Sequence, residues 1–336
     1  MSLTVLACGP GTTVQDMGRP GALEFGLSRG GAADRLALAE GAALVGNPPD
    51  CAALELVLAG GRFRAETDLR LALTGASMPL SVDGAAVPAY TSFALRKGAV
   101  LDIGAARAGV YGYLHVAGGI VTPERLGSRS AHLPAGLGKA LAAGDTLPTG
   151  PAPNGDTDLT LTPEPRLSGG EIRVVESAQS RHFADQLDRF QATEFTRDAH
   201  GNRMGVRMAS DGPGFAAQGG LRILSEIVVP GDIQITGDGT PFVLLADCQT
   251  TGGYPRLATV IPCDLPRIAQ AAPGTKLRFR VVTLDDALQA EAAFARHLKA
   301  LPGQVAPRFR HPADIPDLLG YHLISGVITG HEEEHE

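Results

Sequence analysis

The chain has 336 residues, of which 44% are hydrophobic and 19% are charged, and its formal net charge is -7. This composition is typical of a soluble protein with one large core or two smaller ones, and the negative charge argues against nucleic acid and anionic membranes as partners. Four cysteines without a CxxC pair exclude a disulfide framework and a structural zinc site. The N-terminus lacks a signal-peptide pattern and no stretch resembles a membrane span, so we expect a cytoplasmic protein.

Short apolar runs separated by Gly, Asp or Pro dominate the first half of the chain. The predicted strands are Arg62–Arg64, Leu69–Leu73, Tyr90–Leu95, Val100–Ile103 and Tyr111–Val116. The 43 glycines and 24 prolines indicate frequent turns between such strands. This spacing predicts an antiparallel β-barrel in the first half of the chain.

A segment rich in Pro, Gly, Asp and Thr, Gly150–Gly170, predicts a connection between two domains. We place the boundary near residue 160, which gives domains at 1–160 and 161–302 and a C-terminal extension with an acidic tail at 303–336. A weak repeat, Leu95–Ile103 and Ala271–Phe279, suggests an internal duplication because both segments read as a Gly turn that leads into a strand.

Two helices are predicted in the second half. Ser180–Gln191 has Phe183, Leu187 and Phe190 at helical spacing, with Ser180 as N-cap. Leu284–Leu301 is rich in helix formers and ends before a Pro-Gly pair. We expect the apolar face of this second helix to pack against the second domain, and strands to fill the rest of that domain.

The most informative polar cluster follows the apolar run Leu244–Ala246. This run ends abruptly, and the residues after it are Asp247, Cys248, Gln249, Thr250, Thr251, Gly252, Gly253 and Tyr254. Paired glycines permit positive φ and a close approach of the backbone to a ligand, and the amide and hydroxyl groups suit a planar polar substrate. Alternatively, the segment is a Gly-Gly turn of a β-barrel whose polar side chains satisfy the turn backbone.

A second polar cluster lies near the N-terminus. Gly9–Gly21 places Gln15, Asp16 and Arg19 between glycines, and Gly26–Asp34 continues the cluster with further polar side chains. If both clusters meet in one cleft, they offer carboxylates, a cation and amide groups to a small amide. Glu55 and Lys139 are further candidates for that cleft.

Three other motifs favour ordinary structure. Gly136–Ala140 resembles a phosphate loop, but Leu133 stands at the position of the first glycine and Ala140 replaces the required hydroxyl residue. His331–His335 matches HExxH, yet in an acidic terminal stretch a solvated tail is the better interpretation. Cys248 has no His near it in sequence and an Asp beside it, so we expect an inert thiol.

Several segments from about residue 9 to about residue 283 follow one another in a characteristic order. Besides the two polar clusters, they include Tyr111–Ile120, Leu126–Ser130, Ala142–Leu147, Asn202–Met208 and Ile223–Ile235. In this order they resemble the family that includes the C subunit of 5-oxoprolinase, the antagonist of the sporulation kinase inhibitor and allophanate hydrolase subunit 2, which is related to the carboxyltransferase domain of urea carboxylase. The resemblance implies a mainly β fold with a few helices, built from two pseudo-duplicated cyclophilin-like β-barrel domains with a cleft between them.

The resemblance and the residue types together select the site residues. Asp247, Asp16 and Arg19 are the predicted catalytic residues, and the predicted substrate-binding residues are Gln15, Asp34, Ser128, Gln249, Thr250, Thr251, Gly252, Gly253 and Tyr254. Asp247 is the first choice for the acid or base at an amide nitrogen. No metal ligands are assigned, although Asp247 alternatively holds Mg²⁺ beside nucleotide phosphates. Asp16 and Asp34 alternatively form structural pairs with Arg19 or Arg35.

The resemblance implies the C subunit of an ATP-dependent 5-oxoprolinase, which opens 5-oxoproline to L-glutamate together with A and B subunits. ATP with Mg²⁺ is then used by the whole complex, and we expect no tightly bound cofactor in this chain. One alternative is a carboxyltransferase subunit that acts on urea or a related small amide. Another is a noncatalytic regulatory partner of a kinase inhibitor that resembles the B subunit.

Three positions depart from the family pattern. Glu176–Gln179 stands where relatives usually have Pro-Gly-Pro-Gln, Cys248 replaces a residue that is often Arg, and Glu226–Ile227 lies where a Glu-Gly pair is common. These departures indicate either a divergent substrate or a noncatalytic role.

Overall fold

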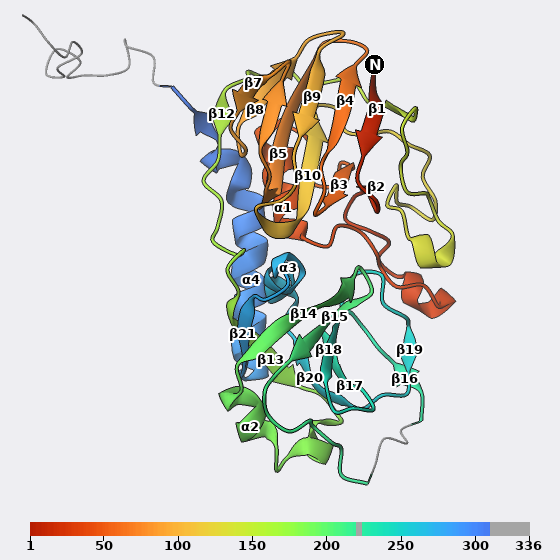
Figure 1. Ribbon diagram of the computed structural model, residues 1–336, viewed down its shortest axis with the longest axis vertical. Coiled ribbons are helices and arrows are strands. Elements are labelled where there is room, and N and C mark those ends of the chain that lie inside the picture. Colours follow the sequence, from red (N-terminus) through yellow and green to blue (C-terminus); the bar gives the residue numbers. More distant parts are fainter. Residues whose placement is uncertain (220–223, 310–336) are drawn as a thin grey trace, which may run out of the picture.

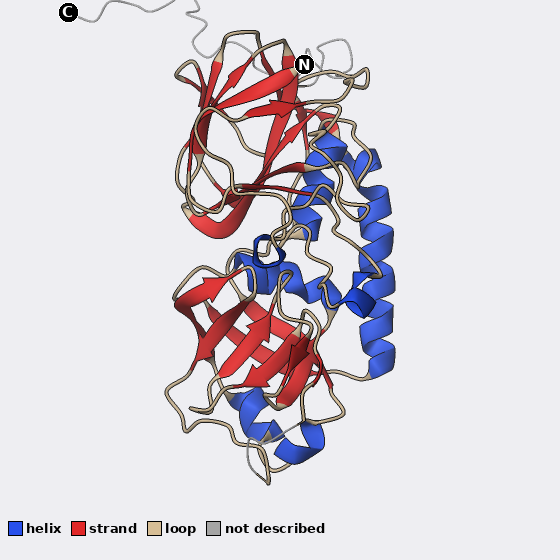
Figure 2. Ribbon diagram, turned by 90° about the vertical axis from the view of Figure 1, so that its right-hand side faces the viewer, coloured by secondary structure: helices blue, strands red, loops and turns tan. Residues whose placement is uncertain are grey.

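The computed structural model describes residues 1–219 and 224–309, and in these ranges the fold is mainly β. Two β bodies lie one above the other along the long axis, and α3 (Leu265–Gln270) lies between them (Figure 1). The longest helix, α4 (Leu284–Ala300), runs along one side of both bodies (Figure 2). No helix in the described ranges is long and apolar enough to cross a bilayer. The predicted fold class is confirmed.

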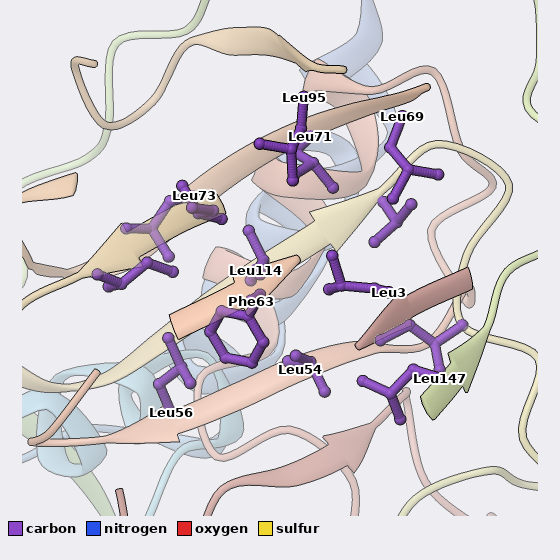
Figure 3. Close-up of a cluster of buried hydrophobic side chains, with 14 of the residues drawn as sticks. Leu3, Leu54, Leu56, Phe63, Leu69, Leu71, Leu73, Leu95, Leu114 and Leu147 are labelled. Atoms are coloured by element: carbon purple, nitrogen blue, oxygen red, sulfur yellow. The ribbon is translucent and has the colours of Figure 1, made fainter. Parts of the chain in front are cut away.

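The first half forms two antiparallel sheets around one core. The six-stranded sheet has the order β11 (Thr146–Pro148), β1 (Ser2–Cys8), β4 (Gly61–Ala65), β9 (Val100–Ile103), β6 (Leu80–Val82), β7 (Ala85–Val87). The five-stranded sheet has the order β2 (Thr13–Gln15), β3 (Ala53–Val57), β10 (Ala108–Val116), β5 (Leu69–Ser77), β8 (Ser92–Leu95). Inward-facing side chains of both sheets, such as Leu3, Phe63 and Leu114, share one core (Figure 3). All five strands predicted in this half are present.

The second half forms a closed barrel with a core of its own. Its strands have the order β13 (Gly170–Glu176), β20 (Arg256–Val260), β17 (Asp232–Ile235), β18 (Pro241–Leu244), β15 (Gly205–Ala209), β14 (Phe195–Asn202), β21 (Lys276–Val281). The pair β13–β21 is parallel and the others are antiparallel. Phe190 and Phe279 stack inside the barrel core with ring centroids 5.0 Å apart.

The remaining elements are short. They are the strand pairs β12 (Leu159–Thr160) with β22 (Ala306–Pro307) and β16 (Glu226–Ile227) with β19 (Thr251–Gly252), and the 3₁₀ helices η1 (Ala22–Phe25), η2 (Leu133–Ala135), η3 (Ser180–Phe183), η4 (Pro262–Asp264) and η5 (Leu301–Gln304). The two turns that suggested an internal duplication share a backbone feature, because Gly98 before β9 and Gly274 before β21 both adopt positive φ.

The helix predicted at Ser180–Gln191 is broken. The structure has η3 followed by the short α2 (Leu187–Ala192). Ser180 does not cap a helix, because its hydroxyl accepts from the Ser177 amide at 2.8 Å and donates to the Leu257 carbonyl at 2.5 Å. These contacts anchor η3 to the barrel, and therefore the apolar spacing of this segment reflects barrel packing instead of one continuous helix.

The helix α1 (Arg35–Leu44) was not predicted from the sequence. Eight of its ten residues are buried, so it has no polar face that would produce helical periodicity. The Asp34 side chain caps it by accepting from the Ala37 amide at 2.9 Å. Gly41 faces the fully buried imidazole of His115 on β10, and a Cβ at Gly41 would lie 2.1 Å from His115 Cδ2.

The predicted helix at the end of the second domain is confirmed as α4, but its packing differs from the expectation. Phe294 and Leu298 pack against a cluster of buried residues that includes Leu36 and Leu44 of α1. The helix also contacts the second half of the molecule, where Glu291 of α4 accepts a hydrogen bond from the Cys263 amide. The helix therefore contacts both halves of the molecule. The acidic His331–His335 stretch lies outside the described residues.

We predict that Gly41→Ala destabilises the protein by about 2 kcal/mol or more, because the added methyl group overlaps His115. An open helical site would instead gain about 1 kcal/mol from the same change. Urea unfolding measures the effect, and Gly212→Ala is the matched control because a Cβ there meets no atom within 4 Å. In a His115→Ala background Gly41→Ala should cost little, because the methyl group then has room, and a Gly41→Ala protein as stable as the parent would refute the packing.

Candidate functional site

Asp247 lies directly beyond the end of β18 and is held by Arg203 in the turn between β14 and β15. The Asp247 amide donates to the Arg203 carbonyl at 2.9 Å. In return, Arg203 Nε donates to Asp247 Oδ2 at 2.7 Å and Arg203 Nη2 donates to Oδ1 at 2.8 Å. This bidentate pair fixes the plane of the carboxylate, whose side chain is only 3% exposed.

Arg203 also reaches the other half of the molecule. Its Nη1 donates to Glu55 Oε1 on β3 at 2.5 Å, and its Nη2 donates to the Gly31 carbonyl at 2.6 Å. The second oxygen of Glu55 accepts from the Tyr113 hydroxyl at 2.7 Å. Burial alone would lower the pKa of Arg203, but Glu55 and Asp247 together raise it well above its ordinary value. The guanidinium is therefore a permanent cation between two buried carboxylates.

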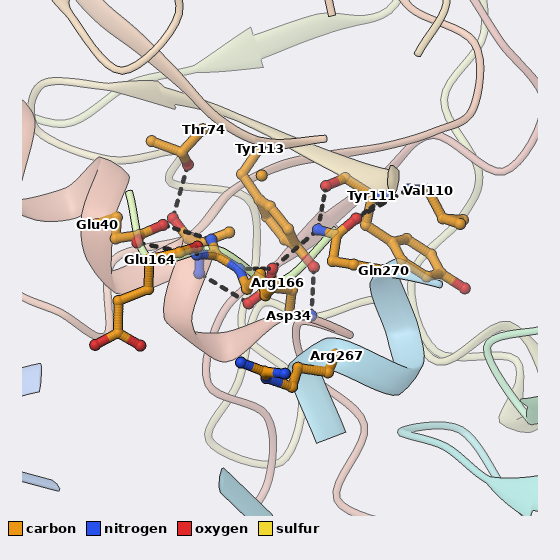
Figure 4. Close-up of polar contacts among 12 residues, drawn as sticks. Asp34, Glu40, Thr74, Val110, Tyr111, Tyr113, Glu164, Arg166, Arg267 and Gln270 are labelled. Carbon is orange, nitrogen blue, oxygen red and sulfur yellow. Dashed lines mark hydrogen bonds and ion pairs between the residues drawn. The ribbon is translucent and has the colours of Figure 1, made fainter. Parts of the chain in front are cut away.

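A second polar link holds β10 in place beside this pair. Gln270 of α3 is fully buried, and its Oε1 accepts from the amides of Val110 and Tyr111 at 2.9 and 3.1 Å. Its Nε2 donates to Asp34 at 2.9 Å and to the Tyr111 carbonyl at 2.8 Å (Figure 4). Burial is the main cause that raises the pKa of the Tyr111 phenol, and the nearby Glu55 raises it further, so the phenol stays protonated. The Tyr111 phenol is thus a hydrogen-bond donor at neutral pH, on a strand that Gln270 holds in place.

A cavity of about 330 Å³ lies between the two halves beside these residues. The first half contributes Gly11, Val57, Leu58, Val110, Tyr111, Leu133 and Pro134, and the second half contributes Arg197, Ala199, Gly201, Asn202, Arg203, Met204, Asp247 and Pro273. Most of this lining is apolar, with a few polar groups among it, which is typical of a site for a small molecule. We call this space the interdomain cavity.

Asp16 is fully engaged by its neighbours and is absent from the lining of the interdomain cavity. Its carboxylate accepts from the hydroxyls of Ser128 and Ser130 at 2.5 Å each, from the Arg129 amide at 2.6 Å and from the Gly18 amide at 2.8 Å. These bonds close the loop around residue 128. The partners of the Asp16 carboxylate are hydroxyls and amides instead of Arg19, and its catalytic role stays a prediction.

The two polar clusters meet at Gly30, which adopts a φ of +61°. A Cβ at Gly30 would lie 3.5 Å from Asp247 Oδ1, 3.9 Å from Arg19 Nη1 and 3.2 Å from His132 Cδ2. Arg19 is 2% exposed, and its other nitrogens donate to carbonyls of the 125–130 loop, whereas Nη1 is buried and has no partner among the described residues. Arg19 and Asp247 therefore do lie close together, as the sequence suggested.

His132 is a member of this region that the sequence did not reveal. Its Nε2 lies 2.8 Å from the Ser28 hydroxyl, and its Nδ1 is buried with no partner in the described part of the chain. Burial lowers the pKa of His132, so the ring is neutral at pH 7. A neutral imidazole beside Asp247 does not compete with Arg203 as its counter-ion.

Besides Ser128, which donates to Asp16, two of the predicted substrate-binding residues are buried in the first half. Gln15 is fully buried and donates to Thr13 and to the Ala131 carbonyl at 3.0 Å each. Asp34 caps α1 and pairs with Arg166 at 2.8 Å (Figure 4). The structural pair proposed for Asp34 is thus present with Arg166 instead of Arg35. Neither residue lines the interdomain cavity.

The residues that follow Asp247 turn away from the interdomain cavity. Gln249 donates to Gln234 at 3.2 Å, Thr250 donates to the Gly26 carbonyl at 3.3 Å, and Thr251–Gly252 forms β19. Tyr254 is 48% exposed. None of the residues from Cys248 to Tyr254 lines the cavity, so substrate binding by Gln249, Thr250, Thr251, Gly252, Gly253 and Tyr254 stays a prediction.

Gly252 has a packing role that the sequence did not reveal. It does not adopt positive φ, and a Cβ there would lie 2.6 Å from Gln234 Nε2. The glycine therefore makes room for a buried amide side chain. Cys248 is buried, and burial raises its thiol pKa to about 12, which agrees with an inert thiol.

Lys139 lines a different and larger cavity, of about 500 Å³, in the first half. Its ammonium group pairs with Asp145 at 2.5 Å, and Arg129 in the same lining pairs with Glu124 at 3.0 Å. These cations already have counter-ions. In the part of the chain that the structure describes, no three His, Cys, Asp or Glu side chains are grouped to hold a metal ion.

Comparison with known proteins agrees with this architecture. The family model described as carboxyltransferase domain, subdomain A and B, matches residues 25–281. The chain is 35% identical to the 5-oxoprolinase C subunit of Haemophilus influenzae over 82% of this chain and 89% of that protein. It is 34% identical to the 5-oxoprolinase C subunit of Escherichia coli over 89% of this chain and 97% of that protein. The crystal structure of Kluyveromyces lactis urea amidolyase superposes with a TM-score of 0.80 at 24% identity, over 93% of this chain and 21% of that one.

We predict that Arg203→Met costs about 3–5 kcal/mol of stability, because it leaves Glu55 and Asp247 buried without a counter-ion. Asp247→Asn should cost less, about 1–2 kcal/mol, because Arg203 keeps Glu55. Urea unfolding measures both, with Arg207→Met as the control, since the half-exposed Arg207 pairs only with Asp198 and Asp238 and should cost less than about 1 kcal/mol. Equal losses for Arg203→Met and Arg207→Met would contradict the bridging role.

Proposed function

The chain belongs to the carboxyltransferase domain family, subdomains A and B, and on this basis we propose that it is the C subunit of an ATP-dependent 5-oxoprolinase. In this function it holds 5-oxoproline while the lactam is opened to L-glutamate. The proposal is supported by relatives of that name at 35% and 34% identity, which align over nearly their whole length. The same name implies further subunits, which we take to be the A and B subunits in the cytoplasm.

The observation that carries the proposal is the interdomain cavity with Asp247 in its wall. Its volume of about 330 Å³ lies at the lower end of the range for small-molecule sites. Apolar side chains such as Val57, Leu58 and Val110 suit the ring methylenes of a lactam. The amide group then faces the polar side chains Asp247, Arg203 and Tyr111.

These polar groups match the two ends of an amide. Asp247 is an acceptor for the lactam N–H, and Arg203 fixes the orientation of the Asp247 carboxylate. Tyr111 stays protonated and is a donor for the lactam oxygen, where negative charge develops when the carbonyl is attacked or phosphorylated. Asp247 is also suited to assist proton transfer at the nitrogen as the ring opens. Asp247 and Arg203 are held by buried hydrogen bonds and the Tyr111 backbone is held by Gln270, so little reorganisation is needed.

Lactam opening is uphill without activation, which ATP provides in the assembled complex. The Gly136–Ala140 turn lacks the phosphate-loop residues, so it offers no site of that kind for a nucleotide. We therefore assign the use of ATP and Mg²⁺ to the complex as a whole.

The alternative with specific support is a carboxyltransferase that acts on urea or a related amide. The name of the family model and the fold shared with urea amidolyase favour it. In that case a biotin-carrying protein delivers the carboxylate, and the same Asp247 side binds the amide. A noncatalytic regulatory role for the chain has no specific structural support.

The proposal is tested by mixing the chain with its candidate A and B subunits and measuring phosphate release that depends on 5-oxoproline. We expect release only with all three proteins, and a fall of about 100-fold or more with Asp247→Asn, because the amide lacks the charge needed for proton transfer. Asp102→Asn is the matched control, since Asp102 is an exposed carboxylate on β9.

Phosphate release that never depends on 5-oxoproline, although the three proteins assemble, would reject the proposed function. Carboxylation of urea by the chain with a biotin carboxylase partner would then support the alternative. If neither reaction occurs while a complex with the B subunit forms, the regulatory role becomes the preferred interpretation.

A further inference from the structure

Arg197 is a buried cation in the wall of the interdomain cavity. It lies on β14, is 5% exposed and lines the cavity together with Tyr111 and Asp247. Its Nη1 donates to the carbonyls of Asp198 and Ala199 at 2.6 and 3.4 Å. Its Nε is buried without a partner, and its Nη2 makes no hydrogen bond to any described residue.

Arg197 differs from Arg203 and Arg166, two largely buried arginines that link the two halves. Arg203 pairs with Asp247 and Glu55, and Arg166 pairs with Asp34 and Glu40. Within residues 1–219 and 224–309, no carboxylate lies within ion-pair distance of Arg197. A buried guanidinium stays charged at neutral pH, and a buried charge without a counter-ion is unfavourable. An anion in the cavity would provide the missing partner.

Gly201 leaves the space that the guanidinium occupies. A Cβ at Gly201 would lie 2.6 Å from Arg197 Nη2 and 2.9 Å from a methyl group of Val206. Burial also lowers the pKa of Arg197, which is the direction expected for a cation without a full set of partners. The site is thus built around the guanidinium, which lies in the cavity wall with its Nη2 free of hydrogen bonds to the described residues.

We propose that Arg197 binds the carboxylate of the substrate, so that the interdomain cavity selects small amides that carry a carboxylate over neutral amides such as urea. This inference rests on the proposed function and deepens it. 5-Oxoproline has both groups, because a carboxylate is attached to its lactam ring. Its amide then faces Asp247 and Arg203, while its carboxylate pairs with Arg197.

The pairing predicts a measurable preference. A charge-assisted hydrogen bond in a desolvated site is worth roughly 30-fold in affinity, which corresponds to about 2 kcal/mol at 1.4 kcal/mol per tenfold. Urea lacks the carboxylate and leaves Arg197 unpaired. The cavity should therefore disfavour urea even though the amide contacts are the same.

The test uses three probes in calorimetric titrations of the full chain, alone and in its complex with the A and B subunits. 5-Oxoproline has the lactam and the carboxylate, 2-pyrrolidinone has the lactam only, and cyclopentanecarboxylate has the carboxylate only. The variants are Arg197→Gln, which removes the charge, and Arg197→Lys, which keeps it without the planar donors. Arg278→Gln is the matched control, because Arg278 is an exposed arginine on β21 of the same barrel.

We expect the parent protein to bind 5-oxoproline about 30-fold more tightly than 2-pyrrolidinone. Arg197→Gln should weaken 5-oxoproline and cyclopentanecarboxylate by about the same factor and leave 2-pyrrolidinone unchanged, and Arg197→Lys should restore part of the loss. Arg278→Gln should match the parent. Thermal unfolding of Arg197→Gln should occur at or above the parent temperature, because the change removes a buried charge without a counter-ion.

Other outcomes separate the inference from the proposed function. Equal weakening of all three probes, or unchanged binding of both carboxylates, would overturn the role of Arg197 even if 5-oxoproline binds well. Binding of cyclopentanecarboxylate that depends on Arg197, with no contribution from a lactam, would support the carboxylate site and reject the lactam substrate. Failure of every carboxylate to bind, with and without the partner subunits, would overturn the inference.

Discussion

The buried guanidinium of Arg203 is the interaction on which the arrangement of the two halves depends. It belongs to the second half, yet one of its two carboxylate partners, Glu55, is on a strand of the first. Separation of the halves would leave Glu55 facing Tyr113 and the Ala33 amide without its cation. Because an uncompensated buried charge is costly, the pair strongly favours one docked arrangement. The interdomain cavity is the space that remains beside this junction.

Further contacts make the cavity wall rigid. Gln270 belongs to the second half but satisfies the β10 backbone at Val110 and Tyr111, and Arg166 in the connecting segment pairs with Asp34 and Glu40 of the first half. Each of these polar groups has its partners within the protein. Arg197 does not, and this contrast gives the cavity its chemical character, with a satisfied carboxylate at Asp247 and a guanidinium that still has free donors.

Much of the fold was predictable because strand signals are local. Val100–Ile103 was predicted with the bounds that the structure has, and α4 was predicted to within one residue. The helix α1 was missed because it is buried on nearly all sides, so its sequence has no amphipathic period. Ser180 looked like an N-cap, but its hydroxyl bonds to β20, a contact that only the tertiary structure creates.

The site was predictable only in part. Asp247 stood out because a carboxylate follows an apolar strand, and the structure places it in a cavity wall beside Arg19. Arg203 lies in an otherwise ordinary turn, and only its distance to Glu55 distinguishes it. Arg197 lies on an otherwise ordinary strand, and only the lack of a counter-ion among the described residues distinguishes it. The Asn202–Met208 segment contributed to the family resemblance and was the one signal that pointed to Arg203.

A crystal structure of the chain with 5-oxoproline, in complex with its partner subunits, tests the central claim most directly. The account predicts the ring in the interdomain cavity, with the lactam amide at hydrogen-bond distance from Asp247 and the carboxylate on Arg197. A ligand bound elsewhere, such as in the larger cavity beside Lys139 or against the Gly252–Tyr254 segment, would contradict it.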